Sequence, residues 1–230
     1  MEIYDYTHQS EYFNSKILQR YLGGMRLGVF DIETLGLYPK YNPMILAGIM
    51  GIEPDGSCHV RQLFAETSKA DEEHLLLAEL ENELSNFDCI LTYNGRYFDI
   101  PYVYERASKL GFDDYCIQPF NLDLLLFLRH YSSLRDTIGS LKQKNVERYM
   151  GLAPARDDEI SGGESVLLYK EFEKCRDEKK KALRFRNSVP APSERLQRLS
   201  CCQYEGSAIR RCLLPEIPSC SSQRGYPSAK

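Results

Sequence analysis

The sequence predicts an α/β fold in which a mixed β-sheet is flanked by helices. Apolar, strand-like runs at residues 26–32, 44–52 and 58–64 come first along the chain. A helix, a short strand at 88–93, a second helix and a last short strand at 120–122 follow. Three strands followed by alternating helices and strands describe a layered α/β protein with a mixed sheet.

Hydrophobic spacing and turn residues predict the helices. Glu66-Thr67-Ser68 opens a helix that continues to residue 84, with leucines along one side. Asn94-Gly95 interrupts the strand at 88–93, and the helical spacing that begins at Ile100 predicts a strand leading into a helix instead of a hairpin. Further helices are predicted at 124–130, 141–150 and 164–174.

Charge and composition divide the chain into chemically different parts. Residues 1–174 contain 17 Lys and Arg against 28 Asp and Glu, whereas residues 175–230 contain 12 against 5. The second part is rich in Pro, Ser and Cys and has no apolar periodicity. We predict an N-terminal helical extension at 1–25 with a helix at 8–22, a folded domain at 26–174, and a basic, disordered tail at 175–230.

Segments that would export the chain or insert it into a membrane are not evident. The sequence has no run of eighteen apolar residues, and its first residues lack the charged and apolar regions of a signal peptide. Cys58, Cys89 and Cys116 are scattered singly, as is typical of reduced thiols. A zinc site in the tail is disfavoured, because it has no CxxC and no His. We expect a cytoplasmic protein.

Two acids, Asp31 and Glu33, stand at the end of the first predicted strand. Alternate residues of a strand point to the same face, so both carboxylates share a face and need a counter-charge. A divalent cation is the usual one. A solvated strand end would contain the same pair, so these two acids alone leave both interpretations open.

Two further acids follow later strands. Asp99 comes after the strand at 88–93, and Asp123 after the strand at 120–122. Functional residues of α/β sheets gather where strands end, so these acids can converge with the first pair. Both also stand where a helix begins, and Asp is a preferred N-cap. For Asp99 the roles of cap and metal ligand are compatible, whereas for Asp123 capping is the favoured role.

Several segments together resemble a known family. VFDIETLGL at 29–37 and TYNGRYFDIPYV at 92–103 are similar to the first two acidic motifs of the DEDD exonuclease superfamily. Segments at 121–131, 140–152 and 156–172 resemble its YprB-type ribonuclease H-like branch. The resemblance covers about residues 26–174. It implies a ribonuclease H-like fold and metal-dependent 3′→5′ hydrolysis of nucleic-acid phosphodiester bonds.

The resemblance also implies roles for individual residues. Asp31 would bridge two Mg²⁺ or Mn²⁺ ions, Glu33 would bind one ion and help orient the attacking water, and Asp99 would hold the second ion. Asn94 and Phe98 would lie near the terminal nucleotide of a DNA or RNA 3′ end. Burial in the core is an equally good explanation of Phe98.

An acidic domain needs local cations to bind phosphates. Arg96, Lys142 and Lys144 are the candidates, and we take Lys142 as a substrate-binding residue. The alternative for each of the three is an ordinary solvated surface position.

The fourth acidic position of the superfamily has no match in this chain. It is expected on a helix after residues 164–174, where a His or Tyr precedes a final Asp, but Asp177 lacks such a neighbour. We therefore predict that the family sequence ends near Cys175 and that activity is impaired. The alternative function is a non-catalytic nucleic-acid-binding or scaffold protein that retains the fold. A phosphotransferase or ATPase is disfavoured, because no GxxxxGK[ST] loop is present.

Overall fold

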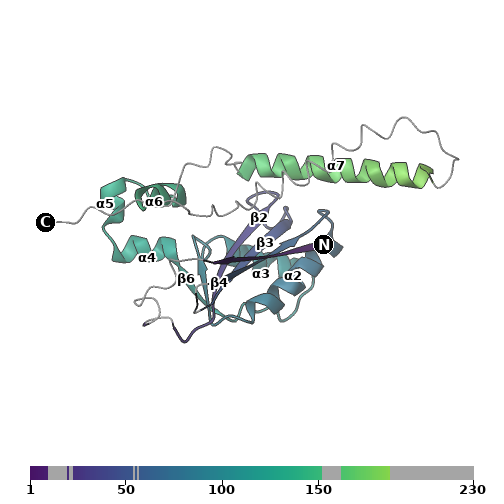
Figure 1. Cartoon of the computed structure of the whole chain (residues 1–230). Helices are drawn as coiled ribbons and strands as arrows, with labels where there is room; N and C mark the ends of the chain where they lie inside the picture. The colour runs from purple at the N-terminus through teal and green to yellow at the C-terminus, as the bar shows by residue number, and fades with distance from the viewer. Residues whose placement is uncertain (10–19, 21–22, 54, 56, 152–161, 187–230) are drawn as a thin grey trace. The chain divides into compact units, whose positions relative to one another are not determined.

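The computed structural model describes residues 1–9, 20, 23–53, 55, 57–151 and 162–186 (Figure 1). The described part contains one sheet and several helices. The strands are β1 (Glu2–Gln9), β2 (Leu27–Thr34), β3 (Met44–Ile52), β4 (Ser57–Phe64), β5 (Cys89–Thr92) and β6 (Phe120–Asp123), and the helices are α2 (Ala70–Leu84), α3 (Asp99–Lys109), α4 (Leu124–Tyr131), α5 (Leu134–Ile138), α6 (Gln143–Tyr149) and α7 (Gly162–Arg186).

The sheet is mixed, as predicted, with the strand order β1-β4-β3-β2-β5-β6. The pairs β1–β4, β4–β3 and β3–β2 are antiparallel, whereas β2–β5 and β5–β6 are parallel. Because β2, β5 and β6 run in the same direction, the residues that end them gather at one edge of the sheet. The predicted acids at 31–33 and at 123 come to this edge, and Asp99 begins the helix that follows β5.

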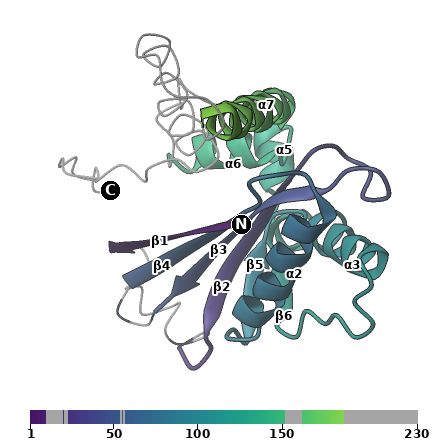
Figure 2. The ribbon, with the colours of Figure 1, turned by 90° about the vertical axis from the view of Figure 1, so that its right-hand side faces the viewer.

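Helices α2 and α3 cover one face of the sheet (Figure 2). Their apolar sides pack on alternate strand residues, because successive side chains of a strand point to opposite faces. The remaining strand positions, Asp31 and Glu33 among them, therefore belong to the other face. The core cluster of buried residues consists of Phe30, Ile32, Met44, Ala47, Ile49, Leu63, Ala65, Leu76, Leu77, Leu80, Leu84, Ile90, Tyr102, Val103 and Ala107.

The N-terminal prediction is wrong for residues 2–9, which form the edge strand β1 and not part of a helical extension. This strand pairs along its whole length with β4, from Glu2 opposite Phe64 to Gln9 opposite Ser57. The paired residues are 48 to 62 positions apart in the chain, and such non-local pairing leaves no sign in a local sequence window. The rest of the predicted helix, at 10–19 and 21–22, lies outside the described residues.

Helix α7 crosses the predicted boundary between domain and tail. It continues to Arg186, so the prediction of disorder is wrong for residues 175–186. The rest of the predicted tail, from residue 187, lies outside the described residues. Contacts divide the chain into the units Met1–Arg156 and Asp157–Lys230, which we describe separately. None of the described helices combines the length and the apolar character that crossing a membrane requires.

Candidate functional site

Asp31 on β2 and Asp99 at the start of α3 form an acidic pair. The Ile32 N–H donates to Asp99 Oδ1 across 3.2 Å, which fixes the carboxylate of the helix against the strand. Asp99 is only 3% exposed. Burial and, in second place, the negative charge of Asp31 raise the pKa of Asp99 to about 7. Asp31 itself is accessible to water, but the protein atoms crowding its carboxylate raise its pKa as well.

No Lys or Arg of the described residues balances the charge of the acidic pair. Within the part of the chain that the structure describes, no ion pair joins Asp31 or Asp99 to Lys or Arg. Glu33 is half-buried on the same strand face as Asp31. The described residues hold no group of three or more His, Cys, Asp or Glu side chains arranged as a metal site. The proposed metal-binding role of Asp31, Glu33 and Asp99 therefore stays a prediction.

Asp123 organises the turn that precedes α3. Its Oδ1 accepts hydrogen bonds from the N–H groups of Leu125 and Leu126, which cap α4, and from the N–H of Asn94. Its Oδ2 accepts one from the N–H of Arg96 across 3.0 Å. The predicted capping role is confirmed. The second role, holding the turn at 94–96, had no signal in the sequence because it depends on β5 and β6 being neighbours.

Asn94-Gly95 turns the chain from β5 into α3, as predicted. Asn94 adopts the left-handed conformation with φ of 70°, which Asn tolerates better than most residues. Gly95 lies against buried Thr92, so a Cβ at position 95 would be 2.5 Å from the Thr92 Cβ. The Thr92 hydroxyl donates to Asn121 Oδ1 across 2.9 Å, which holds Thr92 in this position. The close approach of these backbones therefore requires glycine.

We expect Gly95→Ala to destabilise the protein by about 1–3 kcal/mol, because the added methyl group overpacks the contact with Thr92. Thermal or urea unfolding measures this loss. Gly24→Ala is the matched control, since a Cβ there meets nothing within 4 Å. A Thr92→Gly, Gly95→Ala double variant should lose less than the sum of the two single losses. Equal stability of the Gly95 and Gly24 variants would contradict the expectation.

Helix α3 also fixes the loop at 35–43, which follows Glu33. The Tyr102 hydroxyl lies 2.9 and 2.8 Å from the carbonyl oxygens of residues 36 and 42. Arg106 Nη1 donates to the carbonyl of residue 39, and Lys109 Nζ donates to that of residue 40. The sequence analysis missed these three residues. Their spacing along one side of a helix is the signal that could have found them.

A buried ion pair joins α3 to α2 and to the start of β3. Glu73 is 1% exposed and Arg106 is 5% exposed. Arg106 Nε donates to Glu73 Oε1 across 2.7 Å, and Arg106 Nη2 donates to Glu73 Oε2. The Met44 N–H donates to the same Oε1 across 2.8 Å. Both charges are thus paired and hydrogen-bonded, as burial of charged groups requires.

The predicted substrate-binding residues lie on two different parts of the fold. Asn94 and Phe98 belong to the turn that ends at Asp99. Phe98 packs partly against the core, with its ring centroid 5.5 Å from that of Tyr102, so the alternative of core packing applies in part. Lys142 is exposed and precedes α6. The neighbouring carbonyl, that of Leu141, accepts a hydrogen bond from the Tyr93 hydroxyl at the end of β5.

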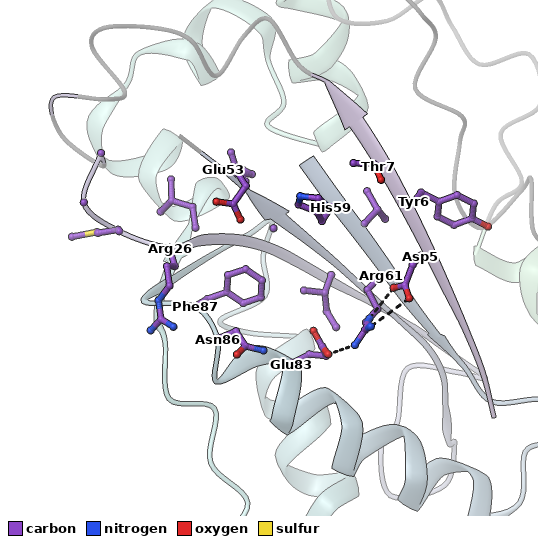
Figure 3. A pocket seen from close by; sticks show the side chains of 18 residues that line it. Asp5, Tyr6, Thr7, Arg26, Glu53, His59, Arg61, Glu83, Asn86 and Phe87 are labelled. Atoms are coloured by element: carbon purple, nitrogen blue, oxygen red, sulfur yellow. Dashed lines mark hydrogen bonds and ion pairs between the residues drawn. The ribbon is translucent and has the colours of Figure 1, made fainter. Parts of the chain in front are cut away.

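A hollow of about 790 Å³ lies at the opposite ends of the strands (Figure 3). None of the predicted site residues lines it. Arg61 points into this hollow and is bound to Asp5 and Glu83. Because acids already neutralise its charge, Arg61 gives the hollow little attraction for phosphate.

A mixed sheet whose parallel strands bring acidic residues to one edge defines an α/β domain of the ribonuclease H-like class. A family model agrees with this class. The model of the RNase_H superfamily matches residues 29–185, and the chain belongs to this superfamily. The match continues past Cys175, near which we expected the family sequence to end.

Three solved structures are similar to the chain at low sequence identity. The family B DNA polymerase from the archaeon Pyrobaculum calidifontis is 19% identical over 82% of this chain and 24% of its own, with a TM-score of 0.49. A metal-free E. coli ExoI–ssDNA complex is 15% identical over 45% of this chain and 29% of its own (TM-score 0.37). Exonuclease I from Methylocaldum szegediense is 14% identical over 57% and 36% (TM-score 0.40). The chain thus spans only about a quarter to a third of these proteins. No curated protein matches it.

Proposed function

We propose that this chain hydrolyses phosphodiester bonds of nucleic acids with divalent cations, from a 3′ end. The observation that carries the proposal is the Asp31–Asp99 pair, which lies at one edge of the sheet of an RNase_H superfamily domain. Among the described residues, no Lys or Arg forms an ion pair with either acid. Keeping two carboxylates together costs free energy, and such unbalanced pairs are concentrated at functional sites. The Ile32 N–H lies between the two acids and donates to Asp99 Oδ1, so the strand backbone holds the two carboxyl groups together.

The donor groups fit Mg²⁺ or Mn²⁺. Carboxylate oxygens are the ligands these hard cations prefer, and a cation would offset the charge that raises the pKa of Asp99. Asp31, Glu33 and Asp99 would hold it. When bound, a divalent cation lowers the pKa of a water molecule and stabilises the leaving oxygen.

The remaining residues hold these acids in position. The Ile32 N–H orients Asp99, and Asp123 holds the turn that carries Asn94. In our proposal Asn94 and the exposed part of Phe98 contact the terminal nucleotide, where an aromatic ring can stack on a base. We also propose that the protein acts in the cytoplasm, the location expected from the sequence.

Hydrolysis of a 5′-labelled single-stranded oligonucleotide in the presence of Mn²⁺ tests the function. We expect a ladder of products shortened from the 3′ end, at a low rate because the fourth acid lacks a match. Asp31→Asn should abolish the ladder, since it removes a proposed metal ligand while keeping the size of the side chain. Asp113→Asn, at an exposed position outside the site, should leave the ladder unchanged. Equal degradation by the wild type and the Asp31 variant removes the enzymatic proposal.

The alternative is a non-catalytic nucleic-acid-binding or scaffold protein, which the unmatched fourth acid favours. Thermal stability measured with and without Mn²⁺ distinguishes a protein that has lost the metal site from one that has lost only catalysis. A ligand that binds only the folded state stabilises it by about 2.7 kcal/mol at a hundred times its Kd. Stabilisation by Mn²⁺ without hydrolysis would support a metal-binding but non-catalytic protein.

A further inference from the structure

The helical segment α4–α6, at residues 124–151, differs in charge from the residues that precede it. Residues 1–123 contain 9 Lys and Arg against 20 Asp and Glu, whereas residues 124–151 contain 5 against 2. A local excess of positive charge in an acidic protein attracts polyanions to that part of the surface. The five basic residues are Arg129, Arg135, Lys142, Lys144 and Arg148.

These basic side chains are exposed and available for binding. Among the described residues, none of the five takes part in an ion pair, and Glu147 instead accepts a hydrogen bond from Gln143. By contrast, three arginines of the sheet region, Arg26, Arg61 and Arg106, are each bound to acids. The positive charge of α4–α6 therefore has no internal role in the part of the chain that the structure describes.

Aromatic side chains are exposed on the same segment. Tyr131 is 78% exposed, Tyr149 57% and Phe127 48%. The ring centroids of Phe127 and Tyr131 are 5.4 Å apart on α4, a helix in which no residue is buried. Exposed aromatic side chains beside basic ones are the combination that binds the bases and the phosphates of a single strand.

Hydrogen bonds connect this segment to the edge of the sheet that carries the acidic pair. Asp123 caps α4 and also binds the N–H of Asn94, in the turn before α3. The Tyr93 hydroxyl donates to the Leu141 carbonyl across 2.5 Å, which joins the start of α6 to the end of β5. The segment α4–α6 is thus joined to the edge of the sheet at which Asp31 and Asp99 lie.

We propose that the exposed side chains of α4–α6 bind single-stranded nucleic acid and hold it as its 3′ end enters the acidic site. This inference rests on the proposed function for the identity of the reacting end. The single strand is the favoured occupant because its unpaired bases can stack on Phe127, Tyr131 and Tyr149. Duplex bases are already stacked on each other and cannot do so.

Fluorescence anisotropy of a labelled single-stranded oligothymidylate with the full chain tests the proposal. The measurement is made in EDTA, so that binding is recorded without hydrolysis. We expect Tyr131→Ala to weaken binding about 5- to 150-fold, the effect typical of losing one stacked base. We expect a Lys142→Glu, Lys144→Glu double variant to lower the slope of log affinity against log salt by about 1.5. Because all three positions are exposed, thermal midpoints should not change.

Matched controls replace similar side chains elsewhere. Tyr6→Ala on β1, where Tyr6 is 49% exposed, controls for loss of an aromatic residue, and Lys69→Glu before α2 controls for charge reversal. Both should bind the oligonucleotide as the wild type does. Asp31→Asn should also keep its affinity for the oligonucleotide. Loss of hydrolysis and loss of binding by α4–α6 are therefore distinguishable results.

Each outcome decides the inference. Weaker binding by the α4–α6 variants alone supports it, even if the chain hydrolyses nothing. Unchanged binding by these variants overturns it, even if hydrolysis is found. Tighter binding to duplex than to single strand overturns it as well. An oligomer that dissociates in the Tyr131 variant, without binding to nucleic acid, would show that a second copy covers this surface instead.

Discussion

Asp99→Asn is expected to stabilise the protein at pH 8 in EDTA. The pKa of the Asp99 carboxyl rises from 3.8 to about 7 on folding. At a pH at which the group is ionised in both states, this rise lowers the free energy of unfolding by at most about 4 kcal/mol. Asparagine removes this cost and keeps an oxygen that accepts the hydrogen bond from Ile32. Urea unfolding of the variant and the wild type measures the difference.

The pH dependence of this gain has a defined sign. Below about pH 4 Asp99 is protonated in both states, so the variant gains nothing. Between pH 4 and about 7 the unfolded carboxyl is ionised while the folded one still holds its proton, so wild-type stability falls as pH rises. Above about pH 7 the carboxyl group is ionised in both states. The variant's gain in the free energy of unfolding is then complete and no longer changes with pH. Asp113→Asn, at an exposed position, should show no such rise.

Mn²⁺ should narrow the difference in thermal stability between the Asp99→Asn variant and the wild type. A cation held by Asp31 and Asp99 offsets the repulsion between them, so it stabilises the wild type more than the variant. Thermal midpoints with and without Mn²⁺ at pH 8 measure this effect. Equal stabilisation of both proteins would exclude Asp99 as a metal ligand, and no gain in EDTA would contradict the cost assigned to the acidic pair.

Arg106→Met is expected to destabilise the protein by about 3–5 kcal/mol, because it leaves the Glu73 carboxylate buried without a counter-charge. The variant also loses the hydrogen bond that Arg106 donates to Pro39 in the loop after Glu33. Urea unfolding measures the loss. A Glu73→Gln, Arg106→Met double variant should lose less than Arg106→Met alone, because the glutamine is neutral and still accepts from the Met44 N–H.

Arg61→Met is the matched control for this prediction. Arg61 also binds acidic residues, Asp5 and Glu83 among them, but about a third of its side chain is exposed. Exposed ion pairs contribute about 0–1 kcal/mol, so its loss should be small. Equal losses in the Arg61 and Arg106 variants would contradict the importance of burial in the Glu73–Arg106 pair.

Elements with strong local patterns could be predicted from the sequence. The apolar run of β3 was predicted at Met44–Ile52, and the helical spacing after Asn94-Gly95 predicted α3. The cap of α4 by Asp123 was also predicted, because capping involves neighbours in the sequence. By contrast, β1 is stabilised by pairing with β4, and its own residues alternate too weakly to indicate a strand.

The candidate site could be predicted only where a residue's role depends on its own motif. Asp31 and Asp99 were chosen from their positions after strands, and the Ile32 N–H, next to Asp31, donates to Asp99 Oδ1 in the structure. The helical spacing of Tyr102 and Arg106 could have marked them as residues of one helix face. Their contacts with the loop at 35–43 could not be predicted, because they depend on where that loop lies. An arginine in an amphipathic helix is ordinarily a solvated residue.

The hydrogen bonds from α3 to the loop at 35–43 have a consequence for local unfolding. Surface loops ordinarily exchange their amide hydrogens through small local openings. In this loop the N–H groups of Leu35 and Asn42 donate to the carbonyls of Pro43 and Tyr38, while α3 side chains hold neighbouring carbonyls. These amides should therefore exchange at the slow rate of the helix. Helix α3 carries Asp99 and holds the segment that follows Glu33, so both sides of the acidic site open together or not at all.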